Sequence, residues 1–429
     1  MRKSFVLASL CLIFIFTTNL HSYAQSTAAA MGSHPIEATN WSFQCFKGES
    51  GCGTNGQWIT SNSQPGTVRL WDSGATWGWL NPKKGSYDWQ YLDTWLDLIA
   101  DHQPRAVLYT LGDVPCWIAG SGCFGGAENY SAHPPTDLTS SGSASFNAFV
   151  LALVQHCTPA GHCVKDYVKY WELWNEPNRP THWTGTASQL YNMVKAAVPI
   201  IRNHVSGAKI TTPAICGDDT GWMTSWMKLE NGNTRLSDFY SIHLYLNGPT
   251  DGNKFVPETR MKMIEDMVKT KNANGWTNTP WINSETNFNV NFACVLSAQE
   301  CDSQLVRWHI LQYAYQGGAG GAFNIGWYDW TGSFEGEGYD TYYYTMMKWL
   351  QGASFTASCA SNGNVWTCPL TEASGKKALF VWNTSGDSNY KPASQYTDYR
   401  SFNGTYGGTT HDISTGESIT INTFPEMLE

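Results

Sequence analysis

The sequence predicts an α/β protein made of a (β/α)8 TIM barrel and a C-terminal β-sandwich domain. Apolar runs of strand length alternate with helix-like segments up to about residue 351, and such alternation is typical of a parallel sheet covered by helices. There are eight such runs, the number that closes a barrel. From about Ala353 only short strand-like runs between turn residues remain, which is typical of a sandwich. An open doubly wound sheet is the alternative, but no Gly-x-Gly-x-x-Gly turn follows the first expected strand.

The expected strands of residues 40–351 are apolar runs that end in polar or turn residues. They are Trp41–Phe46, Val68–Trp71, Ala106–Leu111, Tyr170–Glu176, Lys209–Pro213, Asp238–Tyr245, Pro280–Glu285 and Gly321–Trp327. The expected helices have apolar residues three or four positions apart, and two of them have start signals: Asp88 as a cap and Pro257 in the first turn. They are Asp88–His102, Ser145–His156, Ala187–His204, Trp222–Glu230, Pro257–Lys271, Asp302–Tyr315 and Thr341–Leu350.

Residues 352–429 are expected to form the β-sandwich. The predicted strands are Phe355–Ala357, Val365–Cys368, Ala378–Trp382, Tyr399–Phe402 and Ser418–Thr423. No clear line of exposed aromatic residues marks them as a sugar-binding surface, so we expect a structural module.

The N-terminus has the features of a secretory signal peptide. Arg2 and Lys3 precede an apolar run from Phe5 to Phe16, and Ser22-Tyr23-Ala24 matches a cleavage site. We therefore expect residues 1–24 to be removed, residues 25–39 to be a flexible lead-in, and the protein to be secreted or periplasmic. No later segment is long and apolar enough to cross a bilayer, so no membrane contact is expected after cleavage.

The cysteines agree with an oxidising compartment, since ten of them fall into closely spaced pairs. The expected disulfides are Cys45–Cys52, Cys116–Cys123, Cys157–Cys163, Cys294–Cys301 and Cys359–Cys368. Zinc is the alternative, but these spacings are longer than those of paired zinc ligands. Cys216 is left over and is expected to be a buried free thiol; a catalytic cysteine is the second choice.

Composition argues against one class of partner and favours another. The formal charge of −9 gives no basic surface for nucleic acid. Aromatic residues reach 14%, including 21 Trp, and their flat apolar faces suit the C–H faces of sugar rings. No metal or cofactor is expected, because no His/Asp/Glu cluster has ligand spacing.

Two glutamates are the candidate catalytic groups. Glu176 lies in the segment Trp174-Asn175-Glu176-Pro177 at the end of the fourth expected strand, and Glu285 ends the seventh. The C-terminal ends of barrel strands are where such folds place their chemistry. Cleavage of a glycosidic bond requires one protonated and one ionised carboxyl group on opposite sides of the reacting carbon. A surface glutamate in a turn is the alternative for Glu176 taken alone.

The segment Trp171-Glu172-Leu173-Trp174-Asn175-Glu176-Pro177-Asn178, with Glu285 closing a later strand, resembles glycoside hydrolase clan A, and most of all family 39 and its relatives. The resemblance implies retaining glycosidases with a (β/α)8 barrel and a β-sandwich. It implies that Glu176 is the acid/base, that Glu285 is the nucleophile, and that Asn175 holds the sugar 2-hydroxyl. The implied substrate is an oligo- or polysaccharide with β-glycosidic bonds.

The resemblance also implies roles for further residues. Arg69 keeps the nucleophile ionised, Tyr245 donates a hydrogen bond to it, His243 lies beside it, and Trp327 forms the floor of the sugar site. Alternatives stay open for several of them. Arg69 can also pair with Glu172, His243 can be a core histidine, and Trp117, a candidate for stacking on substrate, can be a packing residue.

A non-catalytic carbohydrate-binding barrel is the main alternative function, and a transglycosylase using the same two glutamates is another. The sugar, the linkage, endo or exo action and the oligomeric state are not determined by the sequence.

Overall fold

The computed structural model describes residues 38–40, 67–104, 106–124, 130–217, 219–246, 256–287, 297–317, 320–322, 324–328, 339–350, 352–402 and 407–429. The predicted signal peptide, the predicted strand Trp41–Phe46 and the predicted pair Cys45/Cys52 lie outside these residues. No helix of the described part has both the length and the apolar composition of a membrane span.

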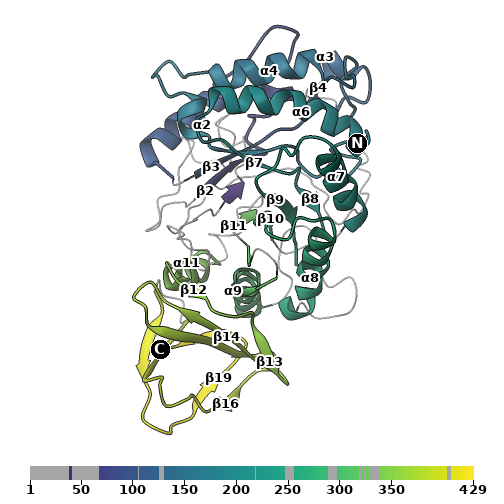
Figure 1. The fold of residues 1–429 in the computed structure, drawn as a ribbon. Coiled ribbons are helices and arrows are strands. Elements are labelled where there is room, and N and C mark those ends of the chain that lie inside the picture. Colours follow the sequence, from purple (N-terminus) through teal and green to yellow (C-terminus); the bar gives the residue numbers. More distant parts are fainter. Residues whose placement is uncertain are drawn as a thin grey trace, which may run out of the picture.

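A parallel sheet forms the centre of the N-terminal part of the molecule (Figure 1). Its strands are β1 (Ala38–Asn40), β2 (Thr67–Leu70), β3 (Ala106–Thr110), β6 (Tyr170–Glu172), β7 (Lys209–Thr211), β8 (Ile215–Cys216), β9 (Tyr240–His243), β10 (Trp281–Thr286) and β11 (Asn324–Tyr328). Their order is β7-β6-β3-β2-β1-β11-β10-β9-β8. The two ends of this path, β7 and β8, belong to one stretch of chain, and Thr211 at the end of β7 bridges Phe239 just before β9.

Apart from the links β1–β2 and β7–β8, described helices connect successive strands of the sheet and lie outside it (Figure 1). They are α1 (Trp77–Leu80), α2 (Gln90–His102), α3 (Cys116–Ala119), α4 (Ala144–Gln155), α5 (Val164–Tyr167), α6 (Ala187–His204), α7 (Thr220–Gly232), α8 (Pro257–Ala273), α9 (Ala298–Ala314) and α11 (Tyr339–Leu350). A short antiparallel pair, β4 (Val114–Pro115) and β5 (Tyr130–Ser131), follows β3. Outward residues of the strands, such as Val107 and Trp171, share one buried cluster with the helices.

The opposite face of the sheet changes from apolar to polar along the strands. Leu108, Ile282 and Phe239 form a separate buried cluster, against which Tyr170 packs. Two residues further along each strand, on the same face by alternation, are Thr110, Ser284, Ser241 and Glu172, and all four are buried. The polar part of this face therefore lies toward the C-terminal ends of the strands.

The C-terminal part is antiparallel (Figure 1). Its strands are β12 (Ser354–Phe355), β13 (Ala360–Asn362), β14 (Val365–Thr371), β15 (Lys377–Asn383), β16 (Ser388–Tyr390), β17 (Asp398–Ser401), β18 (Thr409–Asp412), β19 (Ile419–Ile421) and β20 (Glu426–Leu428). They form a main sheet of order β12-β14-β15-β20-β17-β18, with β13 paired to β14, and a separate pair of β16 and β19.

Buried contacts join the two parts. Trp349 on α11 packs on Phe402 with ring centroids 4.3 Å apart. Glu258 at the start of α8 accepts hydrogen bonds from Arg307 on α9 and from the Trp382 indole on β15, the latter at 2.7 Å. The chain is thus a mixed α/β protein with a parallel and an antiparallel sheet in contact.

Most expected elements are present, with shifted ends. Helix α6 has the predicted bounds, whereas α9 begins four residues before the predicted Asp302, because Ser297 and Glu300 form a capping box there. Strand β1 begins inside the segment 25–39 that was predicted to be a flexible lead-in, so that prediction is wrong for its last two residues. Strands β13, β16, β18 and β20 were not predicted; they are short, and β13 and β18 are largely exposed and polar.

The disulfide predictions are confirmed for Cys116–Cys123, Cys157–Cys163 and Cys359–Cys368. Cys301 is also disulfide-bonded, while its predicted partner Cys294 lies outside the described residues. The prediction that Cys216 is a free thiol is wrong, because Cys216 is disulfide-bonded. Cys163, its nearest cysteine in the preceding chain, is bonded to Cys157, so the bridge of Cys216 spans a long stretch of sequence that spacing patterns do not reveal.

Candidate active site

Glu176 lies beyond the C-terminal end of β6. The strand ends at Glu172 and not at Glu176 as predicted. The chain still stays beside its neighbour, since Ala214 N–H donates to the Trp174 carbonyl at 2.9 Å and Asn175 bridges Ala214. At Glu176 the backbone has a φ of 41°, a left-handed conformation that is costly for a residue other than glycine and is common at functional sites. This turn directs the chain away from the sheet at the residue before Pro177.

Glu285 reaches the same region because β10 has an irregularity. The register of β10 with β9 shifts between Asn283 and Glu285, which is the signature of a β-bulge. Regular alternation would place Ser284 and Glu285 on opposite faces of the sheet. With the bulge, both side chains contact groups on the inner face: Ser284 contacts Glu172 at 2.7 Å and Glu285 contacts Arg69 at 2.7 Å.

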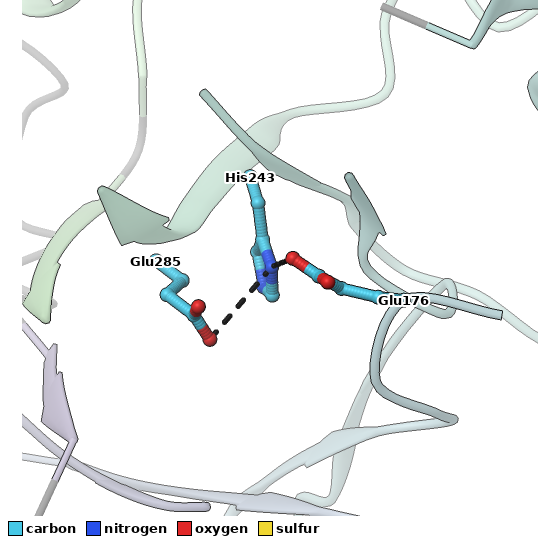
Figure 2. Close-up of side chains that lie close together, drawn as sticks. All are labelled: Glu176, His243 and Glu285. Carbon is cyan, nitrogen blue, oxygen red and sulfur yellow. Dashed lines mark hydrogen bonds and ion pairs between the residues drawn. The ribbon is translucent and has the colours of Figure 1, made fainter. Parts of the chain in front are cut away.

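His243, at the end of β9, lies between the two glutamates (Figure 2). Its Nδ1 is 2.7 Å from Glu176 Oε1 and 3.7 Å from Glu285 Oε2. One oxygen of each carboxyl group and one nitrogen of His243 all lie within 4.8 Å of one another. Glu176 is 2% exposed, Glu285 7% and His243 0%, so the three groups share one buried site.

The two glutamates have different partners. Arg69 on β2 donates from Nη1 to Glu285 Oε2 at 2.7 Å, and the Tyr245 hydroxyl donates to Glu285 Oε1. The side chain of Glu176 is hydrogen-bonded to His243, with His182 Nε2 further away at 3.7 Å from its other oxygen. A cation and a phenol therefore favour the ionised form of Glu285, whereas Glu176 contacts imidazole groups.

Burial raises the pKa of Glu176 well above its ordinary value, and the nearby Glu285 carboxylate raises it further, against the opposing effect of Arg179 and Arg69. Burial also raises the pKa of Glu285, but Arg69 and the hydrogen bond from Tyr245 lower it. Since the two carboxyl groups are close, one proton shared between them belongs on Glu176. Glu285 is then the ionised partner.

The two histidines of the site are neutral. Burial and the Arg69 guanidinium hold the pKa of His243 well below its ordinary value. Burial, Arg69 and Arg179 lower the pKa of His182 to about 3.

Six of the eight residues expected in the site lie together: Arg69, Asn175, Glu176, His243, Tyr245 and Glu285. Asn175 accepts from Arg69 at 2.8 Å. Arg69 contacts Glu285 and Glu172 at the same time, because it also donates from Nε to Glu172 at 3.0 Å.

Of the two predicted tryptophans, Trp117 is not part of the described contacts of this group. Trp117 lies on α3 and donates from its indole to the Asn81 carbonyl at 2.8 Å, and none of its described contacts reaches the glutamates. Trp327 is in β11, but its side chain lies outside what the structure describes.

Several site residues were not expected from the sequence. His182 faces Glu176 and meets the edge of the Trp71 ring, with centroids 5.8 Å apart. Gly112 leaves room for that ring, since a Cβ there would come within 2.4 Å of it. Ser241 could have been found by alternation, because it precedes His243 by two residues on the same strand. Ser284 lies two residues after Ile282 of the inner face, and the bulge brings its neighbour Glu285 to the same face.

Glu176, His243 and Glu285 are also the one group among the described residues whose spacing could suit a metal ion. His243 and Glu176 are already hydrogen-bonded to each other at 2.7 Å, and Glu285 is already paired with the Arg69 guanidinium. A cation bound here would have to displace that guanidinium or lie against it, which is electrostatically unfavourable. We therefore do not assign metal ligands in this site.

No protein-family model and no curated protein sequence matches this chain. Among solved structures, a family 39 glycoside hydrolase from the gut symbiont Bacteroides cellulosilyticus WH2 aligns with a TM-score of 0.60 at 15% identity, over 85% of this chain and 75% of that one. The family 30 subfamily 8 xylanase Xyn30A from Clostridium acetobutylicum aligns with a TM-score of 0.56 at 13% identity, over 95% and 97% of the two chains. A conserved exported protein from Bacteroides fragilis aligns with a TM-score of 0.59 at 11% identity, over 95% and 99%. The chain thus has the fold of glycoside hydrolases of families 39 and 30, and the resemblance to clan A expected from its sequence is confirmed at the level of the fold.

Proposed function

We propose that this protein is a retaining glycoside hydrolase that cleaves β-glycosidic bonds in oligo- or polysaccharides, with Glu285 as nucleophile and Glu176 as acid/base. The observation that carries the proposal is the unequal surroundings of two neighbouring buried carboxyl groups. Glu285 is bonded to Arg69 and Tyr245, while Glu176 is bonded to a neutral His243. One ionised and one protonated carboxyl group at a short distance is what the double-displacement reaction requires.

In the first step, a Glu285 oxygen attacks the anomeric carbon while the bond to the leaving oxygen breaks. Glu176 gives its proton to that oxygen, so the first product leaves as an alcohol and the sugar remains as an ester of Glu285. In the second step, water attacks the anomeric carbon, Glu176 accepts the proton of the water, and the ester bond breaks. The two inversions at the anomeric carbon give net retention.

The spacing of the carboxyl groups supports retention. Their closest oxygens lie within 4.8 Å of each other, whereas inverting enzymes separate the two carboxyl groups by roughly 6.5–9.5 Å to hold a water molecule between them. Asn175, fixed by its bond from Arg69, is placed next to Glu176 and is proposed to bind the 2-hydroxyl of the sugar.

We further propose that the parallel sheet is a closed (β/α)8 barrel that begins with β1 and extends to residue 351, and that residues 352–429 form a β-sandwich. Closure is supported by the meeting of the two ends of the strand path, where Thr211 bridges Phe239 and β8 pairs with β9. The disulfides favour an extracytoplasmic location, as the N-terminal sequence suggests.

A non-catalytic sugar-binding protein would not need this arrangement. Keeping Glu285 and Glu172 buried around Arg69 costs desolvation energy, and a binding site gains nothing from a neutral carboxyl group next to an ionised one. A transglycosylase with the same two glutamates differs only in the acceptor of the second step.

The test is a screen of the mature chain against aryl β-glycosides and polysaccharides, followed by NMR analysis of the first-formed anomer. Glu285→Gln should abolish turnover, and Glu176→Gln should slow substrates with poor leaving groups by about 10²–10⁴-fold, while both keep substrate binding. Glu265→Gln, an exposed glutamate on α8, is the matched control and should behave as the parent. An inverted product, or full activity in either site variant, rules out the mechanism.

A further inference from the structure

Glu172 is a buried carboxylate that the reaction itself does not use. It is 0% exposed and accepts hydrogen bonds from four strands of the sheet. Oxygen Oε2 accepts from Arg69 on β2 and Thr110 on β3, and oxygen Oε1 accepts from Ser241 on β9 at 2.6 Å and Ser284 on β10 at 2.7 Å. Glu172 therefore connects the two sides of the site beneath the two glutamates.

The hydrogens of this network can be counted. Glu172 accepts from Arg69 and three hydroxyl groups, so it is a carboxylate without a proton, and each hydroxyl group must supply the hydrogen of its own bond. Ser284 has one hydroxyl hydrogen, and the 2.7 Å bond to Glu172 takes it. Ser284 Oγ also lies 2.9 Å from Ser241 Oγ, whose own hydrogen is directed to Glu172 Oε1. Ser284 Oγ can then only accept from its remaining close neighbour, His243 Nε2, at 3.1 Å.

Arg69 cannot supply a hydrogen to His243 Nε2 instead. The two hydrogens of Arg69 Nη2 are directed to Glu172 and to Asn175 Oδ1, the latter at 2.8 Å. The distance from Nη2 to His243 Nε2 is 3.4 Å, long for a hydrogen bond between nitrogens. Nε2 is therefore the nitrogen of His243 that carries the hydrogen.

A neutral imidazole has one N–H, so an Nε2–H tautomer leaves a lone pair on Nδ1. That lone pair faces Glu176 Oε1 at 2.7 Å. Two acceptors at this distance repel each other unless one carries a hydrogen, which must then be the proton of the Glu176 carboxylic acid.

We propose that Glu172, acting through Ser284, holds His243 as the Nε2–H tautomer, so that Nδ1 accepts a hydrogen bond from Glu176 and keeps that group protonated as the resting acid. This inference rests on the proposed function and goes further, because it assigns Glu172 and Ser284 as positioning residues for the acid/base. The other charged or titratable groups that face Glu176 and His243 are Glu285, Arg69, Arg179, His182 and Asp72. The negative ones among them favour a protonated Glu176 and the positive ones oppose it.

The Nε2–H tautomer of His243 favours both steps of the proposed reaction. After Glu176 has given up its proton, its carboxylate faces the Nδ1 lone pair and lacks a donor there. Its proton affinity stays high, so it is a strong base toward the incoming water. If Nδ1 carried the hydrogen, it would stabilise the carboxylate, so less of Glu176 would be protonated at rest and its carboxylate would be a weaker base afterwards.

The experiment reads the tautomer directly from 15N chemical shifts of the full chain labelled with 15N-histidine, with His243→Asn to assign the signals. Two serine variants form a matched pair. Ser241 and Ser284 both donate to Glu172 Oε1, but only Ser284 contacts His243. Ser284→Ala removes the acceptor of Nε2–H, whereas Ser241→Ala keeps it.

We expect the parent and Ser241→Ala to hold the Nε2–H tautomer, and Ser284→Ala to shift toward Nδ1–H. We also measure the pH profile of kcat/KM for a substrate with a poor leaving group. Its alkaline limb should move to lower pH by roughly one pH unit in Ser284→Ala. In Ser241→Ala the alkaline limb should stay in place. An Nδ1–H or doubly protonated His243 in the parent overturns the proposal, as does a Ser284→Ala protein with the parent tautomer. The parent measurement does not need turnover, so it decides the tautomer even if no glycoside is cleaved.

Discussion

Glu426 allows a quantitative prediction about stability that is independent of the proposed activity. It lies on β20 opposite Val381 of β15, and by alternation it shares a face with Leu428, which belongs to a buried cluster with Val381, Ile419 and Ile421. The side chain is 6% exposed, and its Oε2 atom has no hydrogen-bond partner. Burial raises the pKa of Glu426 from 4.5 to about 8.

The sign of the effect follows from linkage. The folded state holds the Glu426 proton more tightly than the unfolded state, so this group favours folding fully below pH 4.5 and loses that contribution as the pH rises to about 8. One pKa unit corresponds to about 1.4 kcal/mol. A pKa of about 8 in place of 4.5 thus corresponds to a loss of up to about 5 kcal/mol between these pH values. Entry of water or a shift of β20 would reduce this value.

Glu426→Gln cannot ionise, so it should escape this loss. The free energy of unfolding, measured by urea titration at pH values from 4.5 to 9, should fall with pH in the parent more steeply than in the variant. The difference between the two proteins should grow by several kcal/mol over this range. Glu417→Gln, an exposed glutamate in the same part of the chain, should run parallel to the parent. A difference between Glu426→Gln and parent that is the same at pH 5 and pH 9 would refute the reasoning.

Other predictions concern the active site and the junction between the two sheets. Tyr245→Phe removes the hydroxyl donor to Glu285. A hydrogen bond to a charged group contributes about 1.5–3 kcal/mol, so kcat/KM for an aryl glycoside should fall by roughly 10–100-fold. An unchanged kcat/KM would exclude this role of Tyr245. Arg307→Met leaves Glu258 as a buried charge without its ion pair and should lower the free energy of unfolding by about 3–5 kcal/mol. Trp382→Phe keeps that ion pair but loses the indole bond to Glu258, so urea titration should show a smaller loss of about 1.5–3 kcal/mol; a larger loss than in Arg307→Met would contradict this ranking.

The sequence was most informative where structure is decided locally. Helix α6 was predicted with its observed bounds from its apolar spacing, and in the structure Thr186 forms a capping box with Gln189 at its start. The pairing of Arg69 with Glu172 was also anticipated, because a charge at that depth of the sheet requires a partner.

The sequence was least informative where orientation depends on neighbouring strands. The β-bulge in β10 turns Glu285 to the inner face, beside Ser284, and the sequence contains no pattern that predicts a bulge there. The same holds for Cys216, whose disulfide joins segments far apart in the sequence. The end of β6 at Glu172 was missed because Trp174 and Asn175 look like strand residues, while in the structure they make isolated contacts with Ala214.

The placement of a single guanidinium explains why the site can serve both steps of the proposed reaction. Arg69 lies between Glu172, which stays ionised, and Glu285, which loses its charge when it forms the ester. In the same step Glu176 gives up its proton, so the negative charge moves from Glu285 to a carboxyl group whose oxygen lies within 4.8 Å of it. The number of charges in the buried site is therefore the same before and after the step, and Arg69 needs no rearrangement to balance them. A site with fixed dipoles and constant charge avoids the reorganisation that water would undergo around a moving charge. This accounts for a buried cation between the two carboxylates at a position where burial alone would favour an uncharged side chain.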